Sequence, residues 1–426
     1  MEKVKNRWLI AASAVGIHLS IGSAYAWSVF TNPMIDEYGW SQTQVSTAFS
    51  IAIFFLGFSA AFMGRFVEKG GPRKSGMLAG LCFGLGVVGS GLATALESLP
   101  LLYLSYGIIG GVGLGIGYIA PVSTLVKWFP DRRGLATGLA IMGFGFAAMV
   151  SSPAIKALID GVGISNTFYI LGTIYFIVMT ASAQYLAPPP EGWAPKGFTE
   201  KQETGKSKIK PDLSQLTANE AIKTRRFWML WFMLFINVTC GIAILAVASP
   251  MAEEIAGMTA FAAAAMVGLL GLFNGGGRIG WASLSDYIGR PNVYSAFFVI
   301  QVVAFAVLPF ASNPLLFQLL LFAILTCYGG GFASIPAYIG DLFGTKQLGA
   351  IHGYILTAWA MAGVVGPILL SLIYDNTNSY TLTMTIFTVM FALALGISLW
   401  IRVDIKRLRG EQEKTAMQHA TAAATK

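Results

Sequence analysis

Long apolar stretches follow one another along almost the whole chain, and they restrict its fold more than any other feature. A helix needs ~20 apolar residues to cross a bilayer. Spans are predicted at residues 8–30, 44–66, 75–95, 101–126, 134–158, 165–187, 227–250, 258–284, 293–311, 315–340, 349–374 and 380–402. Charged residues make up only 11% of the 426 residues, against roughly 25% in a soluble domain. The sequence therefore predicts an all-α membrane protein with twelve transmembrane helices.

Basic residues are concentrated in alternate connections between these spans. They cluster near the N-terminus and at 65–74, 127–133 and 402–409, whereas the other connections carry acids such as Glu97, Glu253 and Asp375. By the positive-inside rule, both termini are expected in the cytoplasm, in a multi-pass protein of the plasma (inner) membrane. On this interpretation the net charge of +8 reflects the orientation of the chain in the membrane. It does not indicate nucleic acid as a partner. We expect a monomer in the lipid bilayer.

The two halves of the chain repeat each other. The run PVSTLVKWFPDRRGLATG begins at Pro121, and PAYIGDLFGTKQLGAIHG begins 215 residues later at Pro336, so that Gly134 aligns with Gly349. An offset of half the chain indicates a six-helix unit doubled with parallel topology. A polar stretch rich in Lys and Pro separates the halves. The expected domains are an N-terminal bundle at 1–187, a cytoplasmic linker at 188–224, a C-terminal bundle at 225–404 and a cytoplasmic tail at 405–426.

Arg278 is the one Lys or Arg predicted to lie deep inside a span. A cation at the centre of a bilayer costs ~2.5–3.5 kcal/mol on insertion scales, so it marks a functional site by default, and its natural partner is an anion. Asn274 lies one helical turn earlier on the same face; it would orient a substrate oxygen or bond another helix. The alternative is that Arg278 extends to the nearby interface, where Asp286 marks a connection.

A motif follows the second span. It reads GRFVEKGGPRK from Gly64, and a shortened form, DYIGR, begins at Asp286. Together with the twelve spans and the duplication, it resembles the major facilitator superfamily over essentially the whole chain, with Glu68 where aspartate is usual. The resemblance implies two six-helix bundles and alternating access. Charge-assisted hydrogen bonds of such a motif would close a cytoplasmic gate, formed by Glu68, Arg73, Asp286 and Arg290. The alternative is that these charges only set the topology of the chain in the membrane.

Three further stretches narrow this resemblance. YAWSVF from Tyr25, KWFPDRRG from Lys127 and NGGGR from Asn274 resemble the oxalate:formate antiporter branch, which is similar to the animal monocarboxylate transporters. The branch implies transport of small carboxylates. Animal monocarboxylate transporters have an aspartate where this chain has Asn274, and oxalate-exchanging relatives have a lysine where it has Trp359.

Aromatic side chains in the spans are candidates to complete a carboxylate site. The hydroxyls of Tyr118 and Tyr328, which lie in glycine-rich runs, would donate to a carboxylate, and Tyr25, Trp27 and Trp359 are weaker candidates. For all five the alternative is packing against helices or lipid. One buried cation matches one carboxylate, because a dianion would leave a negative charge unpaired at a cost of several kcal/mol. This favours lactate, pyruvate or a similar monocarboxylate over oxalate.

His18 and His352 are the groups in the predicted spans that titrate near neutrality. They are the candidates for proton coupling, with packing as the alternative for each. The expected function is thus proton-coupled transport of a monocarboxylate. A carboxylate exchanger is the alternative, and a drug exporter or a receptor is less favoured.

An enzyme is not expected, because no nucleophile–base set, metal-ligand cluster or nucleotide-binding loop stands out. Three cysteines, Cys82, Cys240 and Cys327, lie in predicted spans. They indicate neither a disulfide framework nor a metal site. The sequence therefore predicts no cofactor and no metal.

Overall fold

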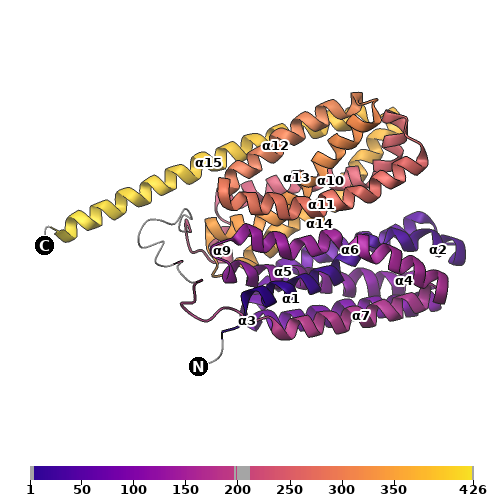
Figure 1. The fold of residues 1–426 in the computed structure, drawn as a ribbon, viewed down its shortest axis with the longest axis horizontal. Helices are drawn as coiled ribbons and strands as arrows, with labels where there is room; N and C mark the ends of the chain where they lie inside the picture. Colours follow the sequence, from indigo (N-terminus) through magenta and orange to yellow (C-terminus); the bar gives the residue numbers. More distant parts are fainter. Residues whose placement is uncertain (1–3, 196–197, 199–211, 425–426) are drawn as a thin grey trace.

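The computed structural model describes residues 4–195, 198 and 212–424, and most of them are helical (Figure 1). The first half comprises α1 (Arg7–Gly22), η1 (Ser23–Ala26), α2 (Ser28–Tyr38), α3 (Gln42–Ala95), α4 (Leu99–Leu102), η2 (Tyr103–Gly110), α5 (Gly111–Trp128), α6 (Arg133–Val162) and α7 (Ile164–Tyr185). The short helix α9 (Ala218–Ala221) precedes the second half. That half comprises α10 (Arg225–Ala256), α11 (Ala260–Ile288), α12 (Arg290–Val307), η3 (Leu308–Phe310), α13 (Pro314–Phe343), α14 (Leu348–Thr377) and α15 (Thr381–Ala424).

Ten helical stretches in the described part of the chain are long and apolar enough to cross a membrane. The prediction of a multi-pass, all-helical membrane protein is therefore confirmed. One of the ten is α3, which the backbone divides at Gly71, where φ is 77° and ψ is 164°. A residue with a side chain rarely adopts this conformation, and Pro72 begins the next segment. The parts of α3 at 42–70 and 72–95 match the spans predicted at 44–66 and 75–95.

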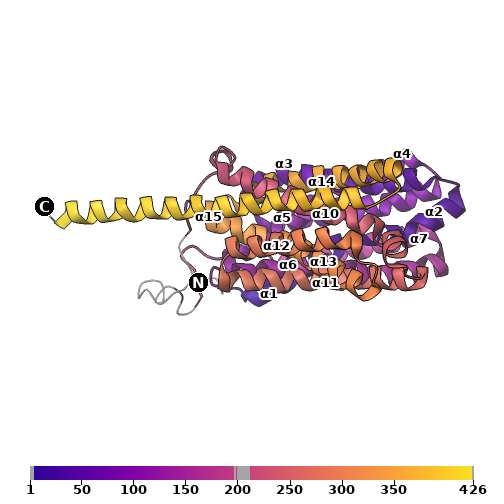
Figure 2. The ribbon, with the colours of Figure 1, turned by 90° about the horizontal axis from the view of Figure 1, so that it is seen from above.

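Two boundaries differ from the sequence-based expectation. The first predicted span, 8–30, ends as an α-helix at Gly22, and a 3₁₀ turn then leads into the separate helix α2. At the other end of the chain, α15 continues through most of the segment predicted as a tail (Figure 2). Polar caps explain many of the starts: side chains of Asn6, Ser41, Thr224, Thr259 and Asn313 accept first-turn N–H groups, at about 1 kcal/mol each.

The helices form two bundles, α1–α7 and α10–α15, which lie side by side (Figure 1). Two seams join them, α3 against α14 and α6 against α11. Small residues allow this close approach. A Cβ atom on Gly64 would lie 2.6 Å from the Cα of Ala350, and one on Gly138 would lie 2.8 Å from the backbone oxygen of Arg278.

One end of the molecule carries α9, the start of α1 and the free end of α15 (Figure 1); we call it the α9 end. Among the described residues, the hydrogen bonds that join the two bundles directly lie between Arg278 and this end. The bundles are therefore bonded together at the α9 end.

Candidate functional site

Arg278 is fully enclosed between the two bundles. Its Nε donates to Oδ1 of Asn274 at 3.3 Å, one turn earlier in α11, and its Nη1 donates across the seam to the backbone oxygen of Ile141 in α6 at 3.2 Å. In the described structure its Nη2 has no hydrogen-bond partner. The side chain does not extend to Asp286, which pairs with Arg290 at 2.7 Å. The guanidinium therefore keeps donor capacity inside the protein.

Two phenylalanines flank the guanidinium, one from each bundle. The Cζ atom of Arg278 lies 5.7 Å from the ring centroid of Phe144 in α6 and 5.4 Å from that of Phe332 in α13. Both distances fall within the range of a cation–π contact. The rings hold the charge between the two bundles without supplying a counter-ion.

Four of the predicted aromatic residues lie around these rings. Ring centroids are 4.7 Å apart for Tyr25 and Phe144, 5.8 Å for Tyr118 and Phe144, 5.4 Å for Tyr328 and Phe332, and 4.7 Å for Trp359 and Phe332. The three tyrosine hydroxyls and the indole N–H are buried without a hydrogen-bond partner in the described structure. Buried donors of this kind are uncommon in native proteins. We call this set the Arg278 cluster: Arg278, Asn274, Tyr25, Tyr118, Phe144, Tyr328, Phe332 and Trp359.

Both histidines border the cluster. The ring of Tyr118 lies 5.4 Å from that of His18 and 5.8 Å from that of His352, measured between centroids. His18 uses Nδ1 for a 3.0 Å hydrogen bond with the backbone oxygen of Ala14. Its Nε2 and both ring nitrogens of His352 have no partner in the described part of the chain. Each neutral imidazole thus offers one unprotonated ring nitrogen next to the cluster for a proton.

Trp27 is not brought to this cluster. Its indole N–H donates to the backbone oxygen of Val45 at 3.2 Å, and its ring lies 4.1 Å from that of Tyr106 and 6.2 Å from that of Phe168. The structure therefore gives Trp27 a satisfied donor and a place in a separate aromatic group.

The two acidic residues of the repeated motif each bind the first turn of a helix in the other bundle. Glu68 accepts the backbone N–H of Gly349 in α14 at 2.6 Å and pairs with Lys127 at 2.8 Å. Asp286 accepts the backbone N–H groups of Gly134 and of the following residue in α6, both at 2.9 Å. A carboxylate is favoured at a helix N-terminus, where N–H groups are free and the helix dipole is positive. The same contact thus occurs once in each seam.

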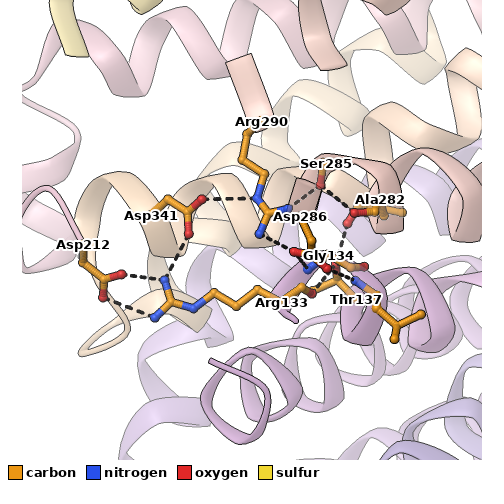
Figure 3. Close-up of polar contacts among 11 residues, drawn as sticks. Arg133, Gly134, Thr137, Asp212, Ala282, Ser285, Asp286, Arg290 and Asp341 are labelled. Atoms are coloured by element: carbon orange, nitrogen blue, oxygen red, sulfur yellow. Dashed lines mark hydrogen bonds and ion pairs between the residues drawn. The ribbon is translucent and has the colours of Figure 1, made fainter. Parts of the chain in front are cut away.

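Further ion pairs continue from Asp286 across the α9 end (Figure 3). Arg290 pairs with Asp286 at 2.7 Å and with Asp341 at 3.2 Å. Asp341 also pairs with Arg133 of the first bundle at 3.1 Å, and Arg133 pairs with Asp212 at 2.6 Å. From here on, "gate residues" means the five residues that make these contacts and are candidates for the predicted gate: Glu68, Asp286, Arg290, Asp341 and Arg133. They tie both bundles together at this end.

Sequence reasoning included one residue that has no such contact and missed others. Arg73 is exposed and forms no ion pair among the described residues. The sequence did not single out Arg133 and Asp341, nor Lys127, which is the ion-pair partner of Glu68. The alignment of Gly134 with Gly349 in the repeat could have indicated where the bundles meet. Both glycines donate a backbone N–H group across a seam.

Residues 212–221 of the predicted linker, which ends at 224, lie against the gate residues; we call this segment the linker strap. The backbone N–H of Leu213 donates to the backbone oxygen of Asp341 at 2.8 Å, and that of Leu216 donates to the oxygen of Phe343 at 2.9 Å. Asn219 accepts a hydrogen bond from Arg65 of the first bundle. This part of the linker is therefore bound to both bundles.

Comparisons with known proteins agree with this architecture. The family model of the Major Facilitator Superfamily matches residues 13–325 and 277–425. The chain belongs to this superfamily. The Escherichia coli fucose:proton symporter has the same fold, with a TM-score of 0.70 over 93% of this chain and 99% of its own, at 15% identity.

Relatives in sequence support the narrower resemblance as well. The oxalate:formate antiporter of Oxalobacter formigenes is 30% identical over 395 residues, which are 91% of each chain. Human monocarboxylate transporter 11 is 24% identical over 388 residues, 88% of this chain and 78% of its own. The chain is therefore a membrane transporter of the branch that the sequence motifs indicated.

Proposed function

We propose that this protein is a secondary active transporter that carries small monocarboxylates of the lactate or pyruvate type by alternating access, in symport with a proton. The observation that carries the proposal is the enclosed guanidinium of Arg278, which has an unpartnered Nη2 and lies between the two bundles. Substrate sites of such transporters lie at the interface of the repeats. Relatives that are carboxylate transporters support the same conclusion.

A carboxylate fits the donors of the Arg278 cluster. The free Nη2 of Arg278 would donate to one carboxylate oxygen. Nη1 would give up its hydrogen bond with Ile141 and donate to the other oxygen, which makes a bidentate pair. The hydroxyls of Tyr118 and Tyr328 supply further donors. Asn274, which faces the guanidinium, would then orient a 2-hydroxyl or 2-keto oxygen.

Charge balance favours one carboxylate over two. Arg278 is the one Lys or Arg in the cluster, and Trp359, with its unpartnered indole N–H, occupies the position where the oxalate-exchanging relatives are expected to have lysine. A second carboxylate would be buried without a cation, at a cost of several kcal/mol. We therefore propose that Trp359 contributes to the selectivity for monocarboxylates over dicarboxylates. The single cation, Arg278, then binds a substrate with one negative charge.

The place of the histidines supports proton coupling. A protonated His18 or His352 would be repelled by the uncompensated charge of Arg278 in the same region. A bound carboxylate neutralises Arg278 and removes that repulsion, so proton and anion favour each other's binding. His18 is the better candidate, because its hydrogen bond with Ala14 orients the ring.

The transport cycle alternates access around this cluster. We place the α9 end, with its basic residues and both termini, in the cytoplasm of a twelve-span monomer in the plasma membrane. The gate residues hold this end closed in the present structure. Opening toward the cytoplasm must break the contacts of Glu68 and Asp286 in both seams.

The alternative is an obligate carboxylate exchanger, which the 30% identity to an oxalate:formate antiporter favours. Purified protein in proteoliposomes distinguishes the two. Labelled lactate, pyruvate, formate and oxalate are offered to vesicles with or without an internal anion, under an inward proton gradient. Gradient-driven lactate accumulation in vesicles without an internal anion supports symport. Uptake that requires an internal anion and ignores the gradient identifies an exchanger, and no uptake of any carboxylate refutes the proposal.

A further inference from the structure

A polar cavity of about 420 Å³ lies at the α9 end, apart from the Arg278 cluster. Its walls come from the connection between α11 and α12, the end of α13 and the inner face of α15, and from Asp131 and Arg133 of the first bundle. Lys406 and Tyr287 on its rim are exposed, so the cavity reaches the surface. The proposed transport mechanism gives a role to the gate residues in its wall. It gives no role to the other side chains that line the cavity.

The cavity gathers hydrogen-bond donors that have no acceptor. Tyr338 is only 1% exposed, and its hydroxyl has no partner in the described structure. Arg402 and Lys406, one turn apart on α15, also line the cavity and form no ion pair among the described residues. The 18-residue helix α12 begins in the wall at Arg290, and its N-cap Gly289 has no side chain to cap it. Pro291 has no N–H group, so the free donors of the first turn are the backbone N–H groups of Arg290 and Asn292.

The acidic residues in the wall are already compensated. Asp131 pairs with Arg7 at 2.6 Å. Asp286 and Asp341 both pair with Arg290, and Asp341 also pairs with Arg133. The uncompensated groups of the cavity are therefore cations and neutral donors.

We propose that this cavity binds the phosphate group of a phosphate ester, with Arg402, Lys406, the hydroxyl of Tyr338 and the N-terminus of α12 as its donors. Phosphate oxygens accept hydrogen bonds from cationic side chains and from helix N-termini. Two sources share this chemistry: the headgroup of an anionic phospholipid and a soluble phosphate.

The surroundings place the cavity at the height of lipid headgroups. On α15, Leu399, Trp400 and Val403 are 47%, 54% and 64% exposed, as expected for a surface in contact with lipid. Arg402 lies within this last apolar turn, and Lys406 follows one turn later. Basic residues next to the cytoplasmic end of a span attract anionic lipids at about 1 kcal/mol each.

The test is a binding measurement on the full chain in phosphatidylcholine nanodiscs. In one arm phosphatidylglycerol replaces part of the phosphatidylcholine in increasing amounts; in the other, inorganic phosphate is added at constant ionic strength. The readout is the thermal unfolding midpoint as a function of ligand. We expect the double variant Arg402→Gln/Lys406→Gln to weaken the apparent affinity about thirtyfold, and Tyr338→Phe to weaken it about fivefold.

The matched control is Arg407→Gln, which removes one positive charge from the same helix at a position that is 72% exposed and does not line the cavity. It should leave the affinity unchanged. A response to phosphatidylglycerol alone identifies a lipid headgroup, and a response to inorganic phosphate in phosphatidylcholine identifies a soluble ligand. No response in either arm, or an equal loss in Arg407→Gln and the double variant, overturns the proposal. Because binding and not transport is measured, the result is independent of the carboxylate carried.

Discussion

Asp286→Asn should open the α9 end, because this carboxylate holds one of the two seams. Asp286 accepts two backbone N–H groups of α6 at 2.9 Å each and pairs with Arg290 at 2.7 Å. Its side chain is 11% exposed, so little solvent screening applies. An asparagine keeps one acceptor oxygen and turns an NH₂ group toward the second N–H, which leaves two donors facing each other.

The size of the effect follows from these contacts. A hydrogen bond to a charged group contributes roughly 1.5–3 kcal/mol, and the substitution removes at least one such bond together with the charge that binds Arg290. A net loss of about 2–4 kcal/mol corresponds to a roughly 30-fold to 1000-fold larger open population. The fold itself should survive, because the contact lies between bundles and not inside one.

Cysteine labelling measures the open population directly. Ser123 is 3% exposed in α5, behind the contact of Glu68 with Gly349, so Ser123→Cys should react only when this end opens. With Cys82, Cys240 and Cys327 replaced, the rate of reaction with a polar maleimide should rise by the factor above in Asp286→Asn.

The matched control for this experiment is Asp160→Asn. It makes the same chemical change at an acid that is 58% exposed and pairs only with Lys156. It should leave the labelling rate unchanged. If Asp286→Asn labels no faster than Asp160→Asn, the carboxylate does not hold the bundles together, and the assignment of the gate residues is wrong.

Four further outcomes are expected. Arg278→Lys should abolish carboxylate counterflow, because the planar fork of the guanidinium is lost. Trp359→Lys should raise competition by oxalate relative to lactate, because a second cation compensates the second carboxylate. His18→Ala should reduce lactate accumulation under a proton gradient while counterflow at equal pH continues. Asp212→Asn should speed labelling of Ser123→Cys several-fold, because Arg133 then loses one of its two carboxylate partners.

Each of these has a clear contrary result. Normal counterflow by Arg278→Lys would remove the arginine from the binding site. An unchanged oxalate-to-lactate ratio in a well-expressed Trp359→Lys variant would mean that selectivity depends on size. Equal loss of driven and equal-pH transport in His18→Ala would indicate a packing role, and an unchanged labelling rate in Asp212→Asn would show that the linker strap does not hold the gate.

The periodic apolar segments and the repeat contained enough information to predict the helices and the two-bundle fold. Arg278 could be found because a cation in an apolar segment is conspicuous, and Asn274 because helical spacing puts it on the same face. The clustering of Tyr25, Tyr118 and Trp359 could only be guessed, since it depends on how helices distant in sequence pack.

The gate was predictable only in part, for a physical reason. The acids Glu68 and Asp286 stand out in the motif, but their partners are backbone N–H groups, which every residue except proline has. No side-chain pattern therefore marks them. Trp27 shows the opposite case, in which a conspicuous aromatic residue next to Tyr25 is used for packing. The linker strap was missed because several of its bonds use backbone groups, which no sequence pattern marks.

The paired contacts of the two seams have a consequence for the origin of the molecule. Each half contributes one acid, Glu68 or Asp286, and one helix whose first turn, at Gly349 or Gly134, donates a backbone N–H group to the acid of the other half. A single six-helix ancestor would hold both parts, and two copies related by a twofold axis would cap each other's helices reciprocally, as in an isologous dimer. The contacts that close the α9 end would then be older than the fusion of the two gene copies. Fusion allowed the copies to diverge: Arg278 lies eight residues before Asp286, and the corresponding position before Glu68 is alanine. A symmetric ancestor with two such arginines would have presented two cations to its substrate.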